Sequence, residues 1–125
     1  MTNDKIERFL AVGSFAVVGA STNRDKYGNK VLRCYAQNGH PVVGVNPRAD
    51  EIEGVPCYAS LVDVPGPPRA VSIVAPPAFA QQIVDDAVRS SVGHLWFQPG
   101  SEDKAAIESA EARGIEVIAL GFRDV

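Results

Sequence analysis

Residues 15–21 read Phe-Ala-Val-Val-Gly-Ala-Ser, a short apolar run that ends in three small residues. A segment rich in helix formers follows from Gly28. This order predicts a buried strand that turns into a helix, with main-chain amides exposed at the turn. Because free amides and the positive end of a helix dipole both attract phosphate, the turn is a candidate anion site.

Strands and helices alternate along the whole chain. Strands are predicted at 15–18, 41–45, 57–58, 70–75, 94–97 and 115–120. Helices are predicted from Lys5, capped by Asp4, to about Val12, from about Gly28 to Gly39, around 79–88, and from the cap Ser101 to Gly114. Strands that are apolar almost throughout are typical of a parallel sheet covered on both faces. The sequence therefore predicts an α/β fold, a doubly wound parallel sheet in a single domain over 1–125, with the first strand between the second and the fourth.

Helical spacing also predicts which side chains face the core. The inner face of the second helix is expected to hold Tyr35 and Ala36, together with the residues at 31–32. Cys34 lies beside these positions and is expected to be a buried structural thiol. Phe79 is expected on the inner face of the third helix.

The composition excludes several classes of function. The chain has 125 residues, 46% of them apolar and 22% charged, which is typical of one compact soluble domain. Its net charge of -3 provides no general attraction for nucleic acid or for an anionic membrane, so neither partner is expected. No apolar run approaches the roughly 20 residues that span a bilayer. The first residues do not lead into a secretory apolar core, and the two distant cysteines are expected as free thiols, so a cytoplasmic location is predicted.

Ligands of doubly wound sheets bind where the winding reverses, which here means the carboxyl ends of the first and fourth strands. Those ends are residues 19–21 and 75–77. The dinucleotide fingerprint Gly-x-Gly-x-x-Gly is absent, and a longer polar loop joins Gly19 to Gly28. This loop is long enough to wrap a phosphate chain, with two hydroxyls at 21–22 and the cations Arg24 or Lys26 as partners. An ordinary solvated loop is the alternative.

The end of the second strand indicates which nucleotide is bound. Enzymes that use unphosphorylated NAD generally carry an acid about 20 residues after the phosphate turn, where it holds the ribose hydroxyls. Here the chain reads Val45-Asn46-Pro47-Arg48, so an acid is missing and a guanidinium is close. An arginine binds a phosphorylated ribose through charge-assisted hydrogen bonds, which favours NADP or coenzyme A (CoA). A solvated turn arginine is the alternative. Because a dehydrogenase needs a further region for its substrate, the length favours CoA.

Four motifs, in their order and spacing, resemble those of one family. They are Val-Val-Gly-Ala-Ser at 17–21, Gly-Val-Asn-Pro-Arg at 44–48, Gly-Val-Pro-Cys-Tyr at 54–58 with Ser-Leu at 60–61, and Trp-Phe-Gln-Pro-Gly at 96–100. From about Ile6 to Leu120 the chain resembles the small CoA-binding proteins built like the amino-terminal domain of the succinyl-CoA synthetase alpha subunit. One departure lies at 121–125, where members often carry an arginine–cysteine or similar pair.

The resemblance implies a place for each part of the ligand. The pyrophosphate would be cradled by Gly19, Ala20 and Ser21, with Lys26 and Asn29 near the phosphates. The ribose phosphate would be bordered by Asn46, Pro47 and Arg48. The apolar wall of the adenine pocket would be formed by Ala75, Pro76 and Pro77, and its far side would be closed by Trp96 to Gln98.

The resulting expectation is a binding protein for a small-molecule nucleotide cofactor, without catalysis of its own. His40 and His94 are the only histidines, and each is expected at a strand edge without a serine or cysteine partner. The synthetase's phosphorylated histidine lies in a separate domain, so the resemblance does not imply ligase chemistry. No residue cluster has the spacing of a metal site. Two alternatives stay open, a small NADP-linked reductase or redox sensor and a ligand-free scaffold that acts by protein contacts; a homodimer stays open as well.

Overall fold

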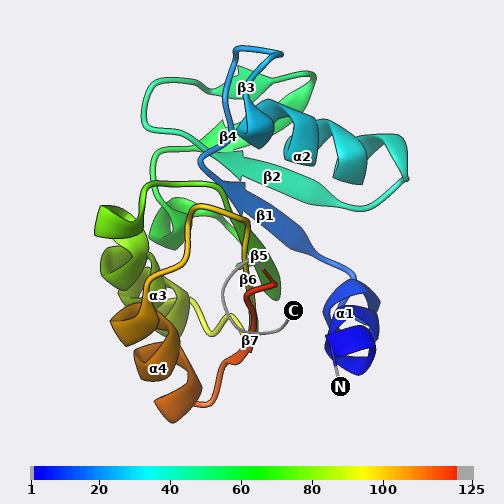
Figure 1. The fold of residues 1–125 in the computed structure, drawn as a ribbon. Helices are drawn as coiled ribbons and strands as arrows, with labels where there is room; N and C mark the ends of the chain where they lie inside the picture. Colours follow the sequence, from blue (N-terminus) through cyan, green and yellow to red (C-terminus); the bar gives the residue numbers. More distant parts are fainter. Residues whose placement is uncertain (1, 121–125) are drawn as a thin grey trace.

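A seven-stranded sheet forms the centre of the molecule, in the order β3-β4-β2-β1-β5-β6-β7 (Figure 1). The structure is a computed structural model and describes residues 2–120. The strands are β1 (Phe15–Val18), β2 (Val42–Val45), β3 (Glu51–Ile52), β4 (Val55–Tyr58), β5 (Ala70–Ile73), β6 (His94–Phe97) and β7 (Glu116–Ile118). The helices are α1 (Thr2–Ala11), α2 (Tyr27–Gln37), α3 (Ala80–Arg89) and α4 (Lys104–Ala112), with short 3₁₀ turns η1 (Leu61–Asp63) and η2 (Pro77–Phe79). Within the described range, no helix combines the length and apolarity needed to cross a membrane.

The first strand lies at the centre of the sheet, as predicted. Phe15 of β1 is in parallel register with Val42 of β2 on one side and with Ala70 of β5 on the other. The chain therefore winds outward from β1 in both directions, and the doubly wound α/β fold is confirmed. This winding brings the carboxyl ends of β1, β2 and β5 together at one edge of the sheet.

One edge of the sheet carries a strand that the sequence pattern did not predict. β3 runs antiparallel to β4, with Ile52 opposite Val55, so the sheet is mixed rather than wholly parallel. The two strands are joined by Glu53 and Gly54, whose φ angles are 53° and 77°. Positive φ at both central residues gives a hairpin turn whose twist matches that of the strands. Because this hairpin extends it, β4 begins at Val55 rather than at Cys57.

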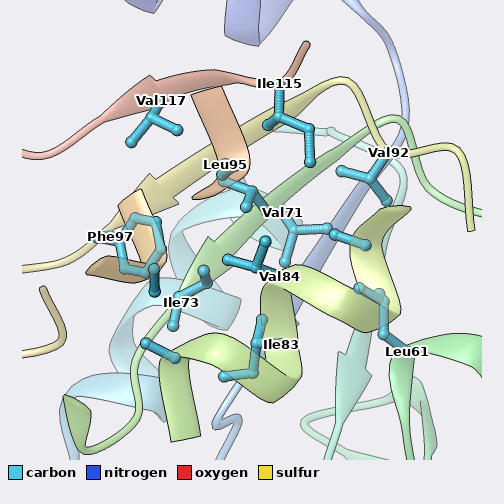
Figure 2. Close-up of a cluster of buried hydrophobic side chains, with 14 of the residues drawn as sticks. Leu61, Val71, Ile73, Ile83, Val84, Val92, Leu95, Phe97, Ile115 and Val117 are labelled. Atoms are coloured by element: carbon cyan, nitrogen blue, oxygen red, sulfur yellow. The ribbon is translucent and has the colours of Figure 1, made fainter. Parts of the chain in front are cut away.

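Helices cover both faces of the sheet, with α1 and α2 on one side and α3 and α4 on the other (Figure 1). Side chains alternate along each strand, so Phe97 packs against α3 and α4 whereas its neighbour Trp96 packs on the α1 and α2 side. Figure 2 shows the α3–α4 core, in which Ile73 of β5 and Val84 of α3 lie close to Phe97. Burial on both faces explains why the strands read as continuous apolar runs.

Some element boundaries differ from the prediction, and at α4 the reason is that two side chains could cap the same helix. The carboxylate of Asp103, rather than Ser101, caps α4 and accepts a 3.0 Å hydrogen bond from the amide of Ala106. Ser101 instead accepts a 3.0 Å hydrogen bond from the amide of Ala75. The first helix begins before Asp4, which lies in its first turn. The last strand covers only 116–118, and residues 121–125 lie outside the described part of the chain.

Three side chains expected in the core are exposed instead. Leu32 and Tyr35 occupy the buried face of α2, and the helical step of about 100° turns Ala36 from that face to solvent. Cys34 lies on the flank of the same helix and is exposed, because α1 packs against β7 and leaves this flank uncovered. Phe79 lies in η2, ahead of α3, and is 58% exposed.

Candidate functional site

A crevice of about 380 Å³ opens at the carboxyl ends of β1, β2 and β5, the place where ligands of doubly wound sheets bind. Its lining comes from the turns that follow these strands, together with η1, η2 and α3. The lining residues are Val18, Gly19, Ala20, Val45, Asn46, Pro47, Ala59, Ser60, Leu61, Val74, Ala75, Pro76, Phe79 and Asp86. The structure thus brings together six of the predicted site residues, namely Gly19, Ala20, Asn46, Pro47, Ala75 and Pro76.

Two glycines let the backbone close up at the turn between β1 and α2. A β-carbon on Gly19 would lie 1.8 Å from the carbonyl oxygen of Val74, and the φ of Gly19 is +93°. A β-carbon on Gly28 would lie 1.9 Å from the carbonyl oxygen of Gly19. The amide of Gly19 donates to the carbonyl of Val45 over 3.2 Å, so this amide is already engaged. The N-terminal turn of α2 therefore packs directly on the β1 turn, a contact that the third glycine of Gly-x-Gly-x-x-Gly makes in dinucleotide-binding folds.

The next main-chain amides of the turn remain available to a ligand. The carbonyl of Ala20 accepts a 2.8 Å hydrogen bond from the side-chain amide of Asn46. The carbonyl of Ser21 accepts one of the same length from the side-chain amide of Asn29. Because a planar trans peptide points its N–H away from its C=O, the amides of Ser21 and Thr22 point away from these side chains. Among residues 2–120, neither amide has a hydrogen-bond partner.

Asn46 joins the end of β2 to the turn after β1 and also shapes its own turn. While its Nδ2 donates to Ala20, its Oδ1 accepts a 2.7 Å hydrogen bond from the amide of Arg48. This closes an Asx turn around Pro47, which lines the crevice. The Arg48 side chain is exposed, does not line the crevice, and makes no hydrogen bond or ion pair with any described residue. Its guanidinium is therefore free for an anionic group.

The side chains of the polar loop divide into structural and free groups. Asn29 is fully buried, and its Oδ1 accepts a 2.7 Å hydrogen bond from Nε of Arg33. Arg24 forms an ion pair with Glu53 at 3.4 Å, which uses a cation that had been considered for the phosphates. Lys26 is exposed at the N-cap position of α2, whose first turn has neither a side-chain cap nor an acidic residue. Lys26 thus adds its charge to the positive end of the helix dipole.

Several predicted residues lie away from the crevice lining. Trp96 and Gln98 line a second cavity, of about 580 Å³, on the α1 and α2 side of the sheet. The sequence places both residues at the end of β6, but the face toward which Trp96 points depends on the register of the sheet. Ser21 and Pro77 directly follow lining residues without lining the crevice themselves. A ligand-binding role for these four residues stays a prediction.

The floor of the crevice depends on close packing around a small residue. A β-carbon on Gly44 would lie 2.6 Å from Sγ of Cys57 and 3.2 Å from Cβ of the lining residue Ala20. Cys57 is 7% exposed, and burial raises the pKa of its thiol. A neutral, buried thiol fills space beneath the turn and is a poor nucleophile, so the structure favours a packing role for Cys57.

The structure also adds residues to the crevice that had no assigned role. Ser60 and Leu61 belong to a motif that carried the family resemblance, but nothing in the motif itself showed that they line a cavity. Asp86 is the lining residue with a carboxylate, and it belongs to none of the four motifs. Phe79 could have been found from its position two residues after Pro77, where α3 has not yet begun and an apolar side chain has no core to enter.

A family model described as the CoA-binding domain matches residues 13–122. The chain belongs to the CoA-binding domain family. Within curated proteins, the CoA-binding domain described here is similar to the ADP-forming acetate–CoA ligase I of Archaeoglobus fulgidus, with 32% identity over 107 residues. That match covers 85% of this chain and 16% of the ligase, so this chain spans less than a fifth of the length of that relative.

Solved structures share the fold of this CoA-binding domain. A conserved hypothetical protein from Pyrococcus furiosus is 39% identical, with a TM-score of 0.79 over 84% of this chain and 90% of that one. A hypothetical protein from Pyrococcus horikoshii is 27% identical, with a TM-score of 0.89 over 95% of this chain and 84% of that one. The family resemblance read from the four motifs is thereby confirmed, together with the Rossmann-like fold.

Proposed function

We propose that this domain binds CoA or an acyl-CoA through the adenosine 3′-phosphate 5′-diphosphate part of the ligand, without catalysis of its own. The observation that carries the proposal is the crevice at the carboxyl ends of β1, β2 and β5, in a chain that belongs to the CoA-binding domain family. The crevice volume of about 380 Å³ lies within the range of pockets that hold small molecules.

The diphosphate is assigned to the turn between β1 and α2. The amides of Ser21 and Thr22 have no partner among the described residues and supply donors. The uncapped N-terminus of α2 and the exposed Lys26 supply positive charge. Small side chains at Gly19 and Ala20 let an anion approach the main chain closely.

The 3′-phosphate of the ribose is assigned to Arg48. Its guanidinium is exposed, and its main chain is fixed by the 2.7 Å hydrogen bond to Asn46. A guanidinium binds phosphate through two parallel hydrogen bonds, which a shorter or uncharged side chain cannot provide. Residues 45–48 hold no carboxylate, so the acid that would repel a phosphorylated ribose is missing from the end of β2.

The adenine ring is assigned to the apolar side of the crevice. Ala75 and Pro76 form one wall, and the exposed ring of Phe79 lies at the rim. An aromatic ring that is 58% exposed beside a crevice offers a surface on which a base can stack. Asp86 provides a carboxylate that can accept a hydrogen bond from the amino group of adenine.

Isothermal titration calorimetry with CoA, dephospho-CoA, NADPH and NADH tests the proposal. The Arg48→Ala variant should bind CoA about 1.5–3 kcal/mol more weakly, because a charge-assisted hydrogen bond is lost. Dephospho-CoA lacks the 3′-phosphate, so its affinity should not change. Arg89→Ala removes an exposed arginine from the far end of α3 and serves as the matched control.

Three outcomes would contradict the proposal. If Arg48→Ala weakened the binding of CoA and of dephospho-CoA equally, the assignment of the 3′-phosphate to this arginine would be wrong. Tight binding of NADPH without any response to CoA would assign the crevice to a different cofactor. Binding of none of the four nucleotides would favour a scaffold that acts through protein contacts.

A further inference from the structure

A second cavity, of about 580 Å³, lies between α1 and α2 on the side of the sheet opposite α3. It follows one flank of α2, because Tyr27, Val31, Cys34 and Asn38 line it from successive turns. Eleven residues of helix rise about 16 Å, so the cavity is an elongated groove rather than a round pocket. Figure 1 shows α1 and α2 standing apart on this side. We refer to this cavity as the α1–α2 groove.

A buried pair of hydroxyls lies at the bottom of the α1–α2 groove. Oη of Tyr35 and Oγ of Ser72 are 2.8 Å apart, and both residues line the groove. Tyr35 is 8% exposed and Ser72 is 1% exposed. Two hydroxyls carry two hydrogens and use only one of them in the bond between them. The second hydrogen has no acceptor among residues 2–120, so the groove offers a buried donor to a ligand oxygen.

The groove opens at the carboxyl edge of the sheet, close to the turn assigned to the diphosphate. Tyr27 and Gln98 line this end, and the Tyr27 hydroxyl lies 3.4 Å from Oε1 of Gln98. The side-chain NH₂ of Gln98 has no hydrogen-bond partner among the described residues and supplies a second donor. Tyr27 precedes Gly28, which touches Gly19, so only the first turn of α2 separates this end of the groove from the crevice.

We propose that the α1–α2 groove takes the pantetheine arm and acyl group of an acyl-CoA, with the carbonyl oxygens of the arm accepting hydrogen bonds from Gln98 and from the Tyr35–Ser72 pair. This inference rests on the proposed function, since the diphosphate must first be held at the β1–α2 turn. It adds a second ligand-binding face to the domain and names the acyl-CoA as a whole, rather than its nucleotide alone, as the ligand.

The chemistry of the groove matches the pantetheine arm and acyl group, a ligand segment that is apolar, rich in carbonyls and joined to the anionic diphosphate at one end. Trp96 and the exposed Leu10 supply apolar surface along the groove. Its lining contains the cation Lys30 and no carboxylate, so a negatively charged ligand meets no repulsion. Burial raises the pKa of Tyr35 to about 12, so its hydroxyl keeps its proton at neutral pH.

Cys34 provides a reporter for occupancy of the groove in the full chain. This thiol is exposed and lines the groove, whereas Cys57 is buried. The experiment measures by mass spectrometry how fast iodoacetamide alkylates Cys34, with hexanoyl-CoA or adenosine 3′,5′-bisphosphate present at ten times its own measured Kd. Because both ligands then occupy the protein to the same extent, a difference between their effects on alkylation reports on the groove rather than on the crevice. Hexanoyl-CoA should slow alkylation about tenfold, whereas the bisphosphate should change it by less than about twofold.

Two helix variants give an independent measurement. Val31→Phe fills the groove and should lower the affinity for hexanoyl-CoA at least about tenfold. Its affinity for the bisphosphate should stay within about twofold of the wild-type value. Ala36→Phe places the same ring on the solvent side of α2 and should change neither affinity. The alkylation experiment uses the wild-type chain, so it decides the inference even if Val31→Phe does not fold.

The outcomes separate the two proposals. If hexanoyl-CoA binds but leaves Cys34 unprotected, the groove inference is overturned while the proposed function stands. If neither nucleotide binds, the proposed function fails and the inference fails with it. If Cys34 becomes protected as the protein concentration rises without ligand, a second copy of the chain occupies the groove and the inference is overturned.

Discussion

The contact between Gly28 and the carbonyl of Gly19 gives the sharpest test of how this fold builds the turn that we propose holds the diphosphate. Replacing Gly28 by alanine adds a β-carbon 1.9 Å from that oxygen, whereas real contacts of this kind essentially never fall below 3.0 Å. The atoms must move apart by at least about 1.1 Å, since neither belongs to a flexible side chain. Gly28 does not have a positive φ, so the substitution adds no backbone strain and its destabilising effect is steric.

Two opposing contributions set the size of the change in the free energy of unfolding of Gly28→Ala. Alanine favours the helix over glycine by up to about 1 kcal/mol. Overpacking of a rigid contact costs about 3 kcal/mol, the upper end of the usual range, because two backbone segments must separate. The net loss in the free energy of unfolding is then about 2 kcal/mol, which for a chain of this size lowers Tm by about 6–12 °C. The shift also displaces the amides of Ser21 and Thr22, so CoA should bind at least about tenfold more weakly.

Thermal denaturation and calorimetry with CoA measure both effects. Gly93→Ala is the matched control, because a β-carbon there meets no atom within 4 Å and the residue has no positive φ. That variant should be neutral or stabilised by up to about 1 kcal/mol, with CoA affinity unchanged. A Gly28→Ala protein that keeps the wild-type Tm and affinity would refute the close contact and, with it, the account of the turn.

Two further predictions concern one hydrogen bond at the site and one partly buried histidine. Asn46→Ala removes the 2.8 Å hydrogen bond to the carbonyl of Ala20, so it should lower the free energy of unfolding by about 1–2 kcal/mol and reduce the affinity for CoA. Calorimetry that shows the same stability and CoA affinity as the wild type would contradict this role of Asn46. Burial lowers the pKa of His94 below its ordinary 6.5, so the unfolded chain takes up the proton first and Tm should fall as the pH drops from about 7 to about 5.5. The hydrogen bond from Arg8 holds the pKa of Glu116 below 4.5, so the stability that Glu116 contributes is lost only at lower pH. His94→Gln should therefore flatten the dependence of Tm on pH between about pH 7 and about pH 5.5. Equal slopes of Tm against pH in the variant and the wild type would contradict the assignment to His94.

Much of the fold could be predicted from the sequence because its signals are local. An apolar run bounded by glycine or proline predicts a buried strand wherever it lies, and the alternation of such runs with helices predicts parallel crossovers. The place of the crevice follows from that winding alone, because ligands of doubly wound sheets bind where the winding reverses. Six predicted residues do line it, from Gly19 to Pro76.

Two of the errors occur where the local sequence suited two residues equally well to one role. Ser101 and Asp103 can both cap a helix, and the choice depends on Ala75, a strand end far along the chain, which uses the Ser101 hydroxyl. Cys34 and Leu32 lie on adjacent parts of one helix, and only the position of α1 leaves the thiol exposed.

The amino-acid sequence by itself determined the order of the parallel strands and the helices, the central strand, and the position of the turn proposed to hold an anion, because periodicity and turn residues act over a few neighbours. Only the tertiary structure decided that Asn46 and Asn29 fix the peptides of that turn, that Arg24 is engaged by Glu53, and that Trp96 faces the α1–α2 groove. The physical reason is distance along the chain. These contacts join segments that no local pattern links, and they form only when packing brings the segments within hydrogen-bond range.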